Sequence, residues 1–295
     1  MTDDLDLPTP LADADFSPRR RAWRGLTPGL LAGSGLMAVL AAAAICAPLL
    51  TSYDPSAIDV TNSLQPPSPT HWFGTDQFGQ DVFTRVVYAA RVDLLIGVVL
   101  VGVALTVGAT VGMLAAWRGG WVDAVVQRVV DIGFAFPFLV LVIAMVGLRG
   151  PGLGSLFIAV SLVAWILYAR LVRTEVRLVR RMDYVTAAQV SGFGTGRVLA
   201  RHVLPNVAGQ LVVYASSDFV YAVLVGASVS FLGLGVQPPT PEWGSMIQAG
   251  QNFITQQWWI AFFPGLAIVY VGVACALIGD GLASVFGITP RGRRG

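Results

Sequence analysis

The sequence of 295 residues contains no lysine, only two cysteines and two histidines, and its charged residues make up only 12% of the chain. Without lysine the chain cannot carry the phosphate-binding lysine of a Walker A loop, so we expect it to hydrolyse no ATP itself. Both cysteines lie in apolar runs, which excludes a disulfide framework and a cysteine-rich metal site. A net charge of +2 is too balanced to indicate nucleic-acid binding. We therefore predict a non-catalytic chain that binds no metal or cofactor.

The scarcity of charge predicts an all-α integral membrane protein. Ordinary soluble domains contain about 25% charged residues, and this chain is 55% hydrophobic. Such a composition excludes intrinsic disorder and would leave large apolar patches facing water in a soluble fold. A helix needs about 20 apolar residues to cross a bilayer. Six runs meet that length approximately, at 29–50, 94–117, 125–148, 152–169, 205–235 and 258–279.

The arginines orient these six spans. If the N-terminus is cytoplasmic, sixteen arginines fall in inside segments and three in outside segments. This bias obeys the positive-inside rule and predicts that both termini are cytoplasmic. The alternative for the first run is a cleaved signal peptide, but 22 apolar residues exceed the usual 7–15 of a signal core.

The remaining segments complete the predicted organisation. Residues 1–27 are expected to form a flexible cytoplasmic tail, 28–51 the first span, and 287–295 a second cytoplasmic tail. Residues 52–93 are expected outside, with an amphipathic surface helix after Asp81 in which Asp81 pairs with Arg85 at i,i+4. Residues 94–286 form the membrane core, which includes a cytoplasmic loop over 170–205.

That cytoplasmic loop carries the functional argument. Five arginines between positions 170 and 181 share one helical face, which indicates that the fourth helix projects from the membrane and holds lipid headgroups. A short helical piece follows, and its small residues would let another protein approach closely. Gly194 and Gly196 are expected to break it before a second short helix, 197–204. A flexible linker is the alternative. The small residues are Ala187, Ala188, Ser191 and Gly192.

Two features within the core leave two interpretations each. Asp218 lies thirteen residues beyond Pro205, near mid-membrane, and either makes an interhelical hydrogen bond or faces a cationic group of a substrate. The Pro-rich segment 233–250 either folds back at a translocation path or is a surface loop. Glycine pairs with GxxxG spacing, at 29/33 and 108/112, permit close helix packing but are common in spans of every function.

The loop resembles the EAA motif of permease subunits of ATP-binding-cassette (ABC) importers. Thr186-Ala187-Ala188, Gly192 and Leu204-Pro205 have the spacing of that motif. Thr186 replaces its usual Glu, and His202 replaces its usual Ile. The segments 73–91, 183–184 and 231–244 resemble one subfamily, the C-type permeases of dipeptide, oligopeptide and nickel importers. Gln80 stands where that subfamily usually has Arg.

The resemblance implies a type I permease fold in a bacterial cytoplasmic (inner) membrane, with a coupling helix that docks onto an ATPase. The implied partners are a second, B-type permease, two cytoplasmic ATP-binding subunits that use ATP and Mg²⁺, and an extracytoplasmic solute-binding protein. The implied substrate is a di- or oligopeptide, with nickel complexes, glutathione or another small solute as alternatives. A stand-alone secondary transporter and a membrane scaffold are further alternatives. The docking residues implied are Tyr184, Thr186, Ala187, Ala188, Gly192, Leu204 and Pro205.

Overall fold

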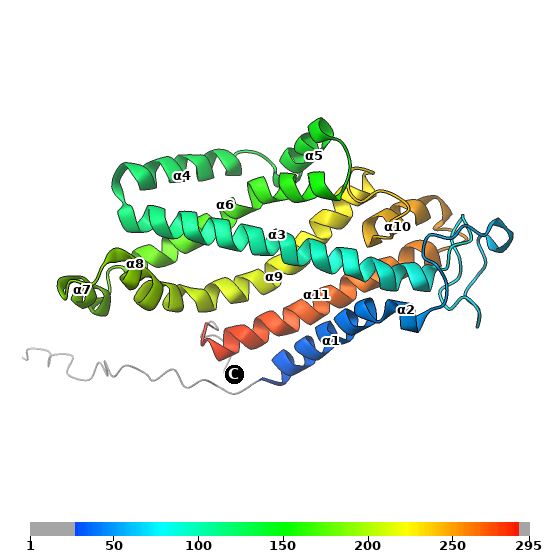
Figure 1. Ribbon diagram of the computed structural model, residues 1–295, viewed down its shortest axis with the longest axis horizontal. Helices are drawn as coiled ribbons and strands as arrows, with labels where there is room; N and C mark the ends of the chain where they lie inside the picture. The colour runs from blue at the N-terminus through cyan, green and yellow to red at the C-terminus, as the bar shows by residue number, and fades with distance from the viewer. Residues whose placement is uncertain (1–26, 289–295) are drawn as a thin grey trace, which may run out of the picture.

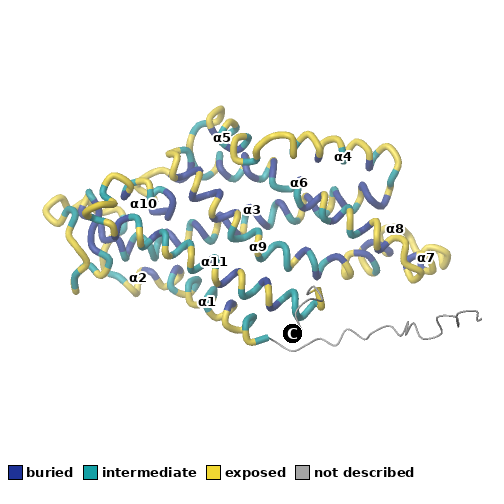
Figure 2. The backbone as a smooth tube through the Cα atoms, turned by 180° about the vertical axis from the view of Figure 1, so that it is seen from behind, coloured by how far each residue is buried: buried dark blue, intermediate teal, exposed yellow. Residues whose placement is uncertain are grey.

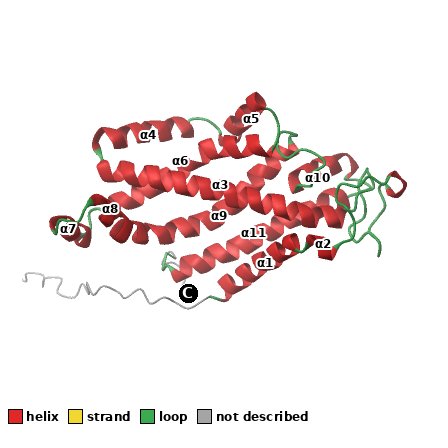
Figure 3. Ribbon diagram, in the orientation of Figure 1, coloured by secondary structure: helices red, strands yellow, loops and turns green. Residues whose placement is uncertain are grey.

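Helices build the whole of the regular structure between residues 27 and 288, the part of the chain that a computed structural model describes (Figures 1 and 3). The predicted tails, 1–27 and 287–295, lie almost entirely outside these residues. The helices are α1 (Pro28–Ile45), α2 (Ala47–Leu50), α3 (Val82–Arg118), α4 (Gly120–Phe134), α5 (Phe138–Arg149), α6 (Leu153–Val179), α7 (Asp183–Val190), α8 (Thr195–Val198), α9 (Leu204–Phe231), α10 (Trp243–Gly250) and α11 (Trp259–Val285), with short turns at Val60–Asn62, Leu199–Val203 and Gln251–Phe253.

Five helical units are long and apolar enough to cross a membrane, which confirms the predicted class. They are α1, α3, α6, α11 and the unit Thr195–Phe231, in which α8 runs through a π-helical turn into α9. A sixth span exists only if α4 and α5 are counted together. The axes of these two helices differ by 87°, so the prediction of one continuous helix over 125–148 is wrong. Pro137 causes the break, because proline disfavours a helical conformation in the residue before it.

The prediction of a separate surface helix after Asp81 is also wrong, because α3 is one continuous helix of 37 residues. Asp81 caps its N-terminus by accepting hydrogen bonds from the Thr84 backbone and hydroxyl, at 2.8 and 2.7 Å. Asp81 therefore does not pair with Arg85. The residues expected to lie flat on the membrane are instead the first turns of the second span, and Val82 is fully buried.

Arg85 instead organises the loop that precedes α3. Its guanidinium lies 3.7 Å from the Asp76 carboxylate and donates hydrogen bonds to Gln80 Oε1 and to the Pro55 carbonyl. Burial raises the pKa of Asp76 above its ordinary value, although backbone amides of Gln80 and Phe78 oppose that shift. Gln80, at the position where the subfamily usually has Arg, thus supplies an amide acceptor to Arg85.

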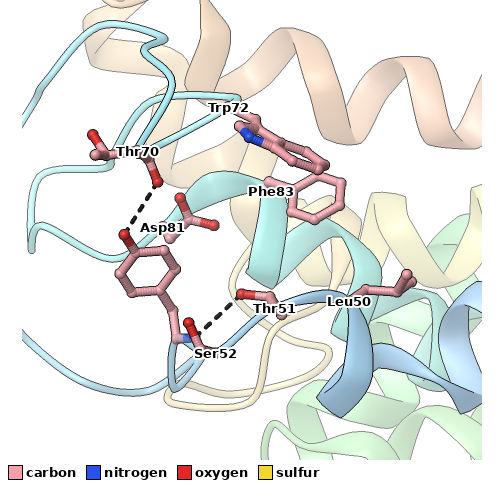
Figure 4. A pocket seen from close by; sticks show the side chains of 8 residues that line it. Leu50, Thr51, Ser52, Thr70, Trp72, Asp81 and Phe83 are labelled. Carbon is pink, nitrogen blue, oxygen red and sulfur yellow. Dashed lines mark hydrogen bonds between the residues drawn. The ribbon is translucent and has the colours of Figure 1, made fainter.

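The same loop folds back on the first span at the end of the bundle that also holds α10. Figure 4 shows Asp81, Thr51 and Thr70 lining one pocket, with Thr51 directly after α2 and Thr70 within the loop. The hydroxyl of Tyr53 donates to the Thr70 carbonyl at 3.1 Å, and the Thr51 hydroxyl bonds the Thr84 hydroxyl at 2.7 Å. The first bond joins two parts of the loop, and the second joins the end of α2 to the start of α3.

Segment 233–250 folds back against the bundle and is not a free surface loop. Trp243 and Glu242 are fully buried, and α10 packs against α9 and α11 (Figure 1). The Trp243 amide donates to Asp93 on α3 at 3.1 Å, and its indole donates to the Val86 carbonyl at 3.1 Å. These bonds fix the start of α10 to α3.

The predicted glycine pairs lie at helix crossings. A Cβ placed on Gly112 would lie 2.4 Å from the Ala169 carbonyl oxygen of α6, and one on Gly33 would lie 2.7 Å from the Ala274 carbonyl oxygen of α11. Real Cβ atoms do not approach backbone oxygens so closely, so only glycine permits these contacts. The buried stripes of α3, α6 and α9 face each other in the bundle interior (Figure 2).

Candidate functional site

The candidate docking element, α7, lies at the end of the bundle opposite α10 and projects beyond α3 and α4 (Figure 1). Three residues, 180–182, connect it to α6, and the turn 191–194 connects it to α8. Gly192 has φ +79°, a left-handed conformation that side chains disfavour. Gly194 precedes α8, but Gly196 lies inside it, so only the first of these two glycines marks the predicted break.

Helical phase divides the surface of α7 into an inner and an outer side. Val185 and Ala188 are buried against Val198 and Leu199 of the following helical turns. The remaining positions face outward, and Val190 at the end of α7 is 84% exposed. Ala188 was expected on the smooth outer surface with Ala187. It instead holds α7 against the rest of the chain.

Most of the other sequence-predicted docking residues lie on or near the outer side. Thr186, Ala187 and Gly192 are exposed on α7 and its C-terminal turn. Leu204 and Pro205 are exposed at the first turn of α9. Tyr184 is 41% exposed, and its ring centroid lies 6.5 Å from that of His202.

Three exposed apolar side chains also lie around the outer side of α7, and the sequence did not predict them: Met182, Val190 and Phe193. Helical spacing could have identified Val190. It lies five residues after Val185, which is buried, and therefore on another side of the helix. An apolar residue in an outward position of a loop outside the membrane indicates a surface that another protein covers.

Four of the five arginines between positions 170 and 181 contact protein groups, and the prediction that they hold lipid headgroups stays a prediction. Arg173 and Arg177 both bond the Asp123 carboxylate of α4, and the Arg173 Nε–Oδ1 distance is 2.5 Å. Arg180 lies over the Trp117 ring, 5.4 Å from its centroid, and Arg170 lies over Phe134 at 5.0 Å. The sequence could not show this, because α4 reaches these arginines only by folding back along α6.

Asp123 is expected to fasten α4 to α6. Its side chain is only 7% exposed, so Asp123→Asn would leave two guanidinium groups without their carboxylate. We expect a loss of about 2 kcal/mol in stability, less than for a fully buried pair because Arg177 is half-exposed. Thermal unfolding of the purified protein measures this. Asp131→Asn on the same helix is the control, since exposed Asp131 bonds only Gln127, and equal losses in both variants would contradict the assignment.

Asp218 lies at the middle of α9 and joins it to α6. The Tyr168 hydroxyl donates to Asp218 Oδ2 at 2.9 Å, so the predicted interhelical hydrogen bond is present. None of the ion pairs found among residues 27–288 includes Asp218. The described residues also contain no group of three His, Cys, Asp or Glu side chains able to hold a metal ion.

Comparison with known protein families places these features in context. The family described as the inner membrane component of binding-protein-dependent transport systems matches residues 108–287, which include α7 and Asp218. The chain belongs to this family. A second family, described as the N-terminal TM domain of oligopeptide transport permease C, matches residues 17–67 of the permease. The permease is thus a multi-pass inner-membrane component of an ABC system, and ATP hydrolysis is the task of other subunits.

Curated relatives cover nearly all of the permease. The dipeptide transport system permease protein DppC of Alkalihalophilus pseudofirmus is 42% identical over 90% of this chain and 88% of its own length. The probable D,D-dipeptide transport system permease protein DdpC of Escherichia coli is 40% identical, over 81% and 80% of the two chains. The glutathione transport system permease protein GsiD of Pectobacterium atrosepticum is 36% identical, over 90% and 89%.

Proposed function

We propose that this permease is the C-type subunit of an importer of di- or oligopeptides. Several relatives at about 40% identity over most of their length are dipeptide or peptide permeases, which supports this substrate class. A second, B-type permease would complete the pathway, two ATP-binding subunits would supply energy from ATP and Mg²⁺, and a solute-binding protein would deliver the peptide. GsiD supports glutathione, itself a peptide, as a second candidate substrate.

The outer side of α7 is the proposed docking surface for an ATPase subunit. One observation carries this assignment. Val190 is an apolar residue at the end of a projecting helix, and it is 84% exposed. Thr186, Ala187 and Gly192 add little bulk around it, so an ATPase cleft can close on the backbone of α7. Tyr184, Leu204 and Pro205 flank this surface and would contact the rim of the cleft.

The loop is built to transmit movement of the ATPases to the spans. The inner residues Val185 and Ala188 fix α7 to the helical unit Thr195–Phe231, and only three residues separate it from α6. Arg173 and Arg177 extend the connection to α4 through Asp123. A displacement of α7 would therefore move α4, α6 and α9 together, as rigid-body alternating access requires. In this orientation the α7 end is cytoplasmic and loop 52–81 is outside.

Uptake by the complete importer tests the proposal. Proteoliposomes that contain this permease, its B-type partner and both ATPases are expected to accumulate alanyl-phenylalanine only when ATP and the binding protein are supplied together. Vesicles without the ATPases provide the control. Peptide uptake by these control vesicles under an imposed proton gradient would favour a secondary transporter and contradict the proposal.

A further inference from the structure

Asp218 lies in the middle of a membrane-spanning helix, and none of the cationic side chains among residues 27–288 forms an ion pair with it. Acidic groups in spans are costly, and they either pair with other protein groups or mark the path of a substrate. Tyr168 bonds Oδ2 only, and no described side chain bonds Oδ1. The site thus offers an acceptor oxygen, Oδ1, that a cationic ligand would bond.

Aromatic rings surround this carboxylate. Tyr168 of α6 and Tyr214 of α9 meet edge to face, with centroids 5.1 Å apart. Tyr221 lies one turn beyond Asp218 on α9, and its centroid is 5.8 Å from that of Phe138 of α5. A carboxylate among tyrosine and phenylalanine rings is the chemistry that binds an ammonium group, through charge and through the negative ring faces.

The site is next to surface that this chain leaves uncovered. Tyr221 is 45% exposed and Ser217 is exposed, whereas Tyr168 on the other side of Asp218 is 1% exposed. Asp218, Tyr221 and Phe138 line a cavity of about 10 Å³, which is the smallest volume that admits one water molecule. Phe138 is the first residue of α5, directly after the break between α4 and α5.

We propose that Asp218 binds the free α-ammonium group of the transported peptide through Oδ1, with Tyr214 and Tyr221 packing around the cation, while the Tyr168 bond to Oδ2 holds α9 against α6. This inference rests on the proposed peptide substrate. It assigns the permease itself a specificity for peptides with an unmodified N-terminus, in addition to any selection by the binding protein. The α-ammonium group is the one cation that every such peptide carries, whatever its side chains.

Two ligands that differ only in the ammonium group test the proposal. Uptake of alanyl-phenylalanine and of propionyl-phenylalanine is measured in proteoliposomes of the complete importer, with the same binding protein saturated by each ligand. The ratio of wild-type to variant uptake then cancels the preference of the binding protein. For Asp218→Asn, which preserves the acceptor for Tyr168, we expect about a tenfold loss for alanyl-phenylalanine and less than a twofold loss for propionyl-phenylalanine.

Tyr168→Phe separates ligand binding from helix packing. This variant keeps the carboxylate but removes the hydrogen bond, so we expect equal losses for the two ligands, of less than about threefold. Equal losses of both ligands in Asp218→Asn, or no loss, would overturn the proposal and leave Asp218 as a packing residue. A different result would contradict the proposed function itself: wild-type vesicles that show no ATP-dependent uptake of either ligand. Copurification of the partner subunits checks that both variants assemble.

Discussion

Replacing Val190 by aspartate is expected to release the ATPase subunits from the permease. At 84% exposure, Val190 has almost no contact with its own chain, so the permease should fold and enter the membrane as before. Docking would bury the new carboxylate in an apolar contact without a cation, which opposes association. We expect at least a tenfold fall in the amount of ATPase that copurifies with the permease, equivalent to about 1.4 kcal/mol or more.

The matched control is Val60→Asp, the same change at a residue 74% exposed in the loop before α3. It is expected to leave copurification unchanged, because this loop lies at the other end of the bundle. Similar losses in the two variants would indicate a general effect of the added charge and remove the docking assignment.

Gly192→Trp tests the same surface by bulk. Nothing lies within 4 Å of a Cβ placed on Gly192, so the added ring would project outward into the docking space. The positive φ of Gly192 also disfavours any side chain, at a cost of about 1 kcal/mol. The variant Gly192→Ala measures the effect of this backbone strain without the bulk of the ring. We expect copurification to fall strongly in the tryptophan variant and little in the alanine variant. A Gly192→Trp complex that copurifies and keeps stimulated ATPase activity would refute docking at this turn.

Gly112→Val is expected to prevent stable packing of the membrane core. The added Cβ would lie 2.4 Å from the carbonyl oxygen and 2.9 Å from the Cα of Ala169. These are backbone atoms, so relief requires α3 and α6 to separate along their whole crossing. Overpacking of a close-packed site costs about 1–3 kcal/mol, and we expect the upper end here. Folded permease in the membrane fraction, measured by size-exclusion chromatography after extraction, should fall severalfold.

Gly102→Val on the same helix is the control for this prediction. No atom lies within 4 Å of a Cβ placed on Gly102, so the same gain in side-chain volume and the same change in helix propensity meet no neighbour. Gly102→Val should yield nearly wild-type amounts of folded protein. Equal yields for Gly102→Val and Gly112→Val would contradict the close α3–α6 contact.

The sequence predicted the positions of those helices that hydrophobicity locates, but it did not predict several of the helix ends. The apolar runs locate α1, α6 and α11 well, because the bilayer requires a minimum length of apolar side chains. A helix does not start where its side chains become apolar, so α3 begins at Val82, twelve residues before the apolar run at 94. The bend before Phe138 was also missed, because the run 125–148 has the length of one straight span.

The position of the candidate site along the chain could be predicted from the sequence, but the direction in which each of its residues faces could not. The spacing of Thr186-Ala187-Ala188, Gly192 and Pro205 locates the proposed docking loop without any structure. Ala187 and Ala188 are identical in type, and only the packing of Val185 and Ala188 against Val198 decides that one faces outward and the other inward. In the same way, the sequence places Asp218 in mid-membrane, whereas its surrounding rings come from three different helices.

The sequence by itself determined the membrane class, the number of apolar segments, the location of the proposed docking loop and the absence of a Walker A lysine. These are properties of residue type and of local spacing, and folding does not change them. Only the tertiary structure decided that Asp123 binds Arg173 and Arg177, and that Tyr168 binds Asp218. Each of these pairs joins residues about 50 positions apart, so the arrangement of neighbouring helices determines which charges and hydroxyls meet.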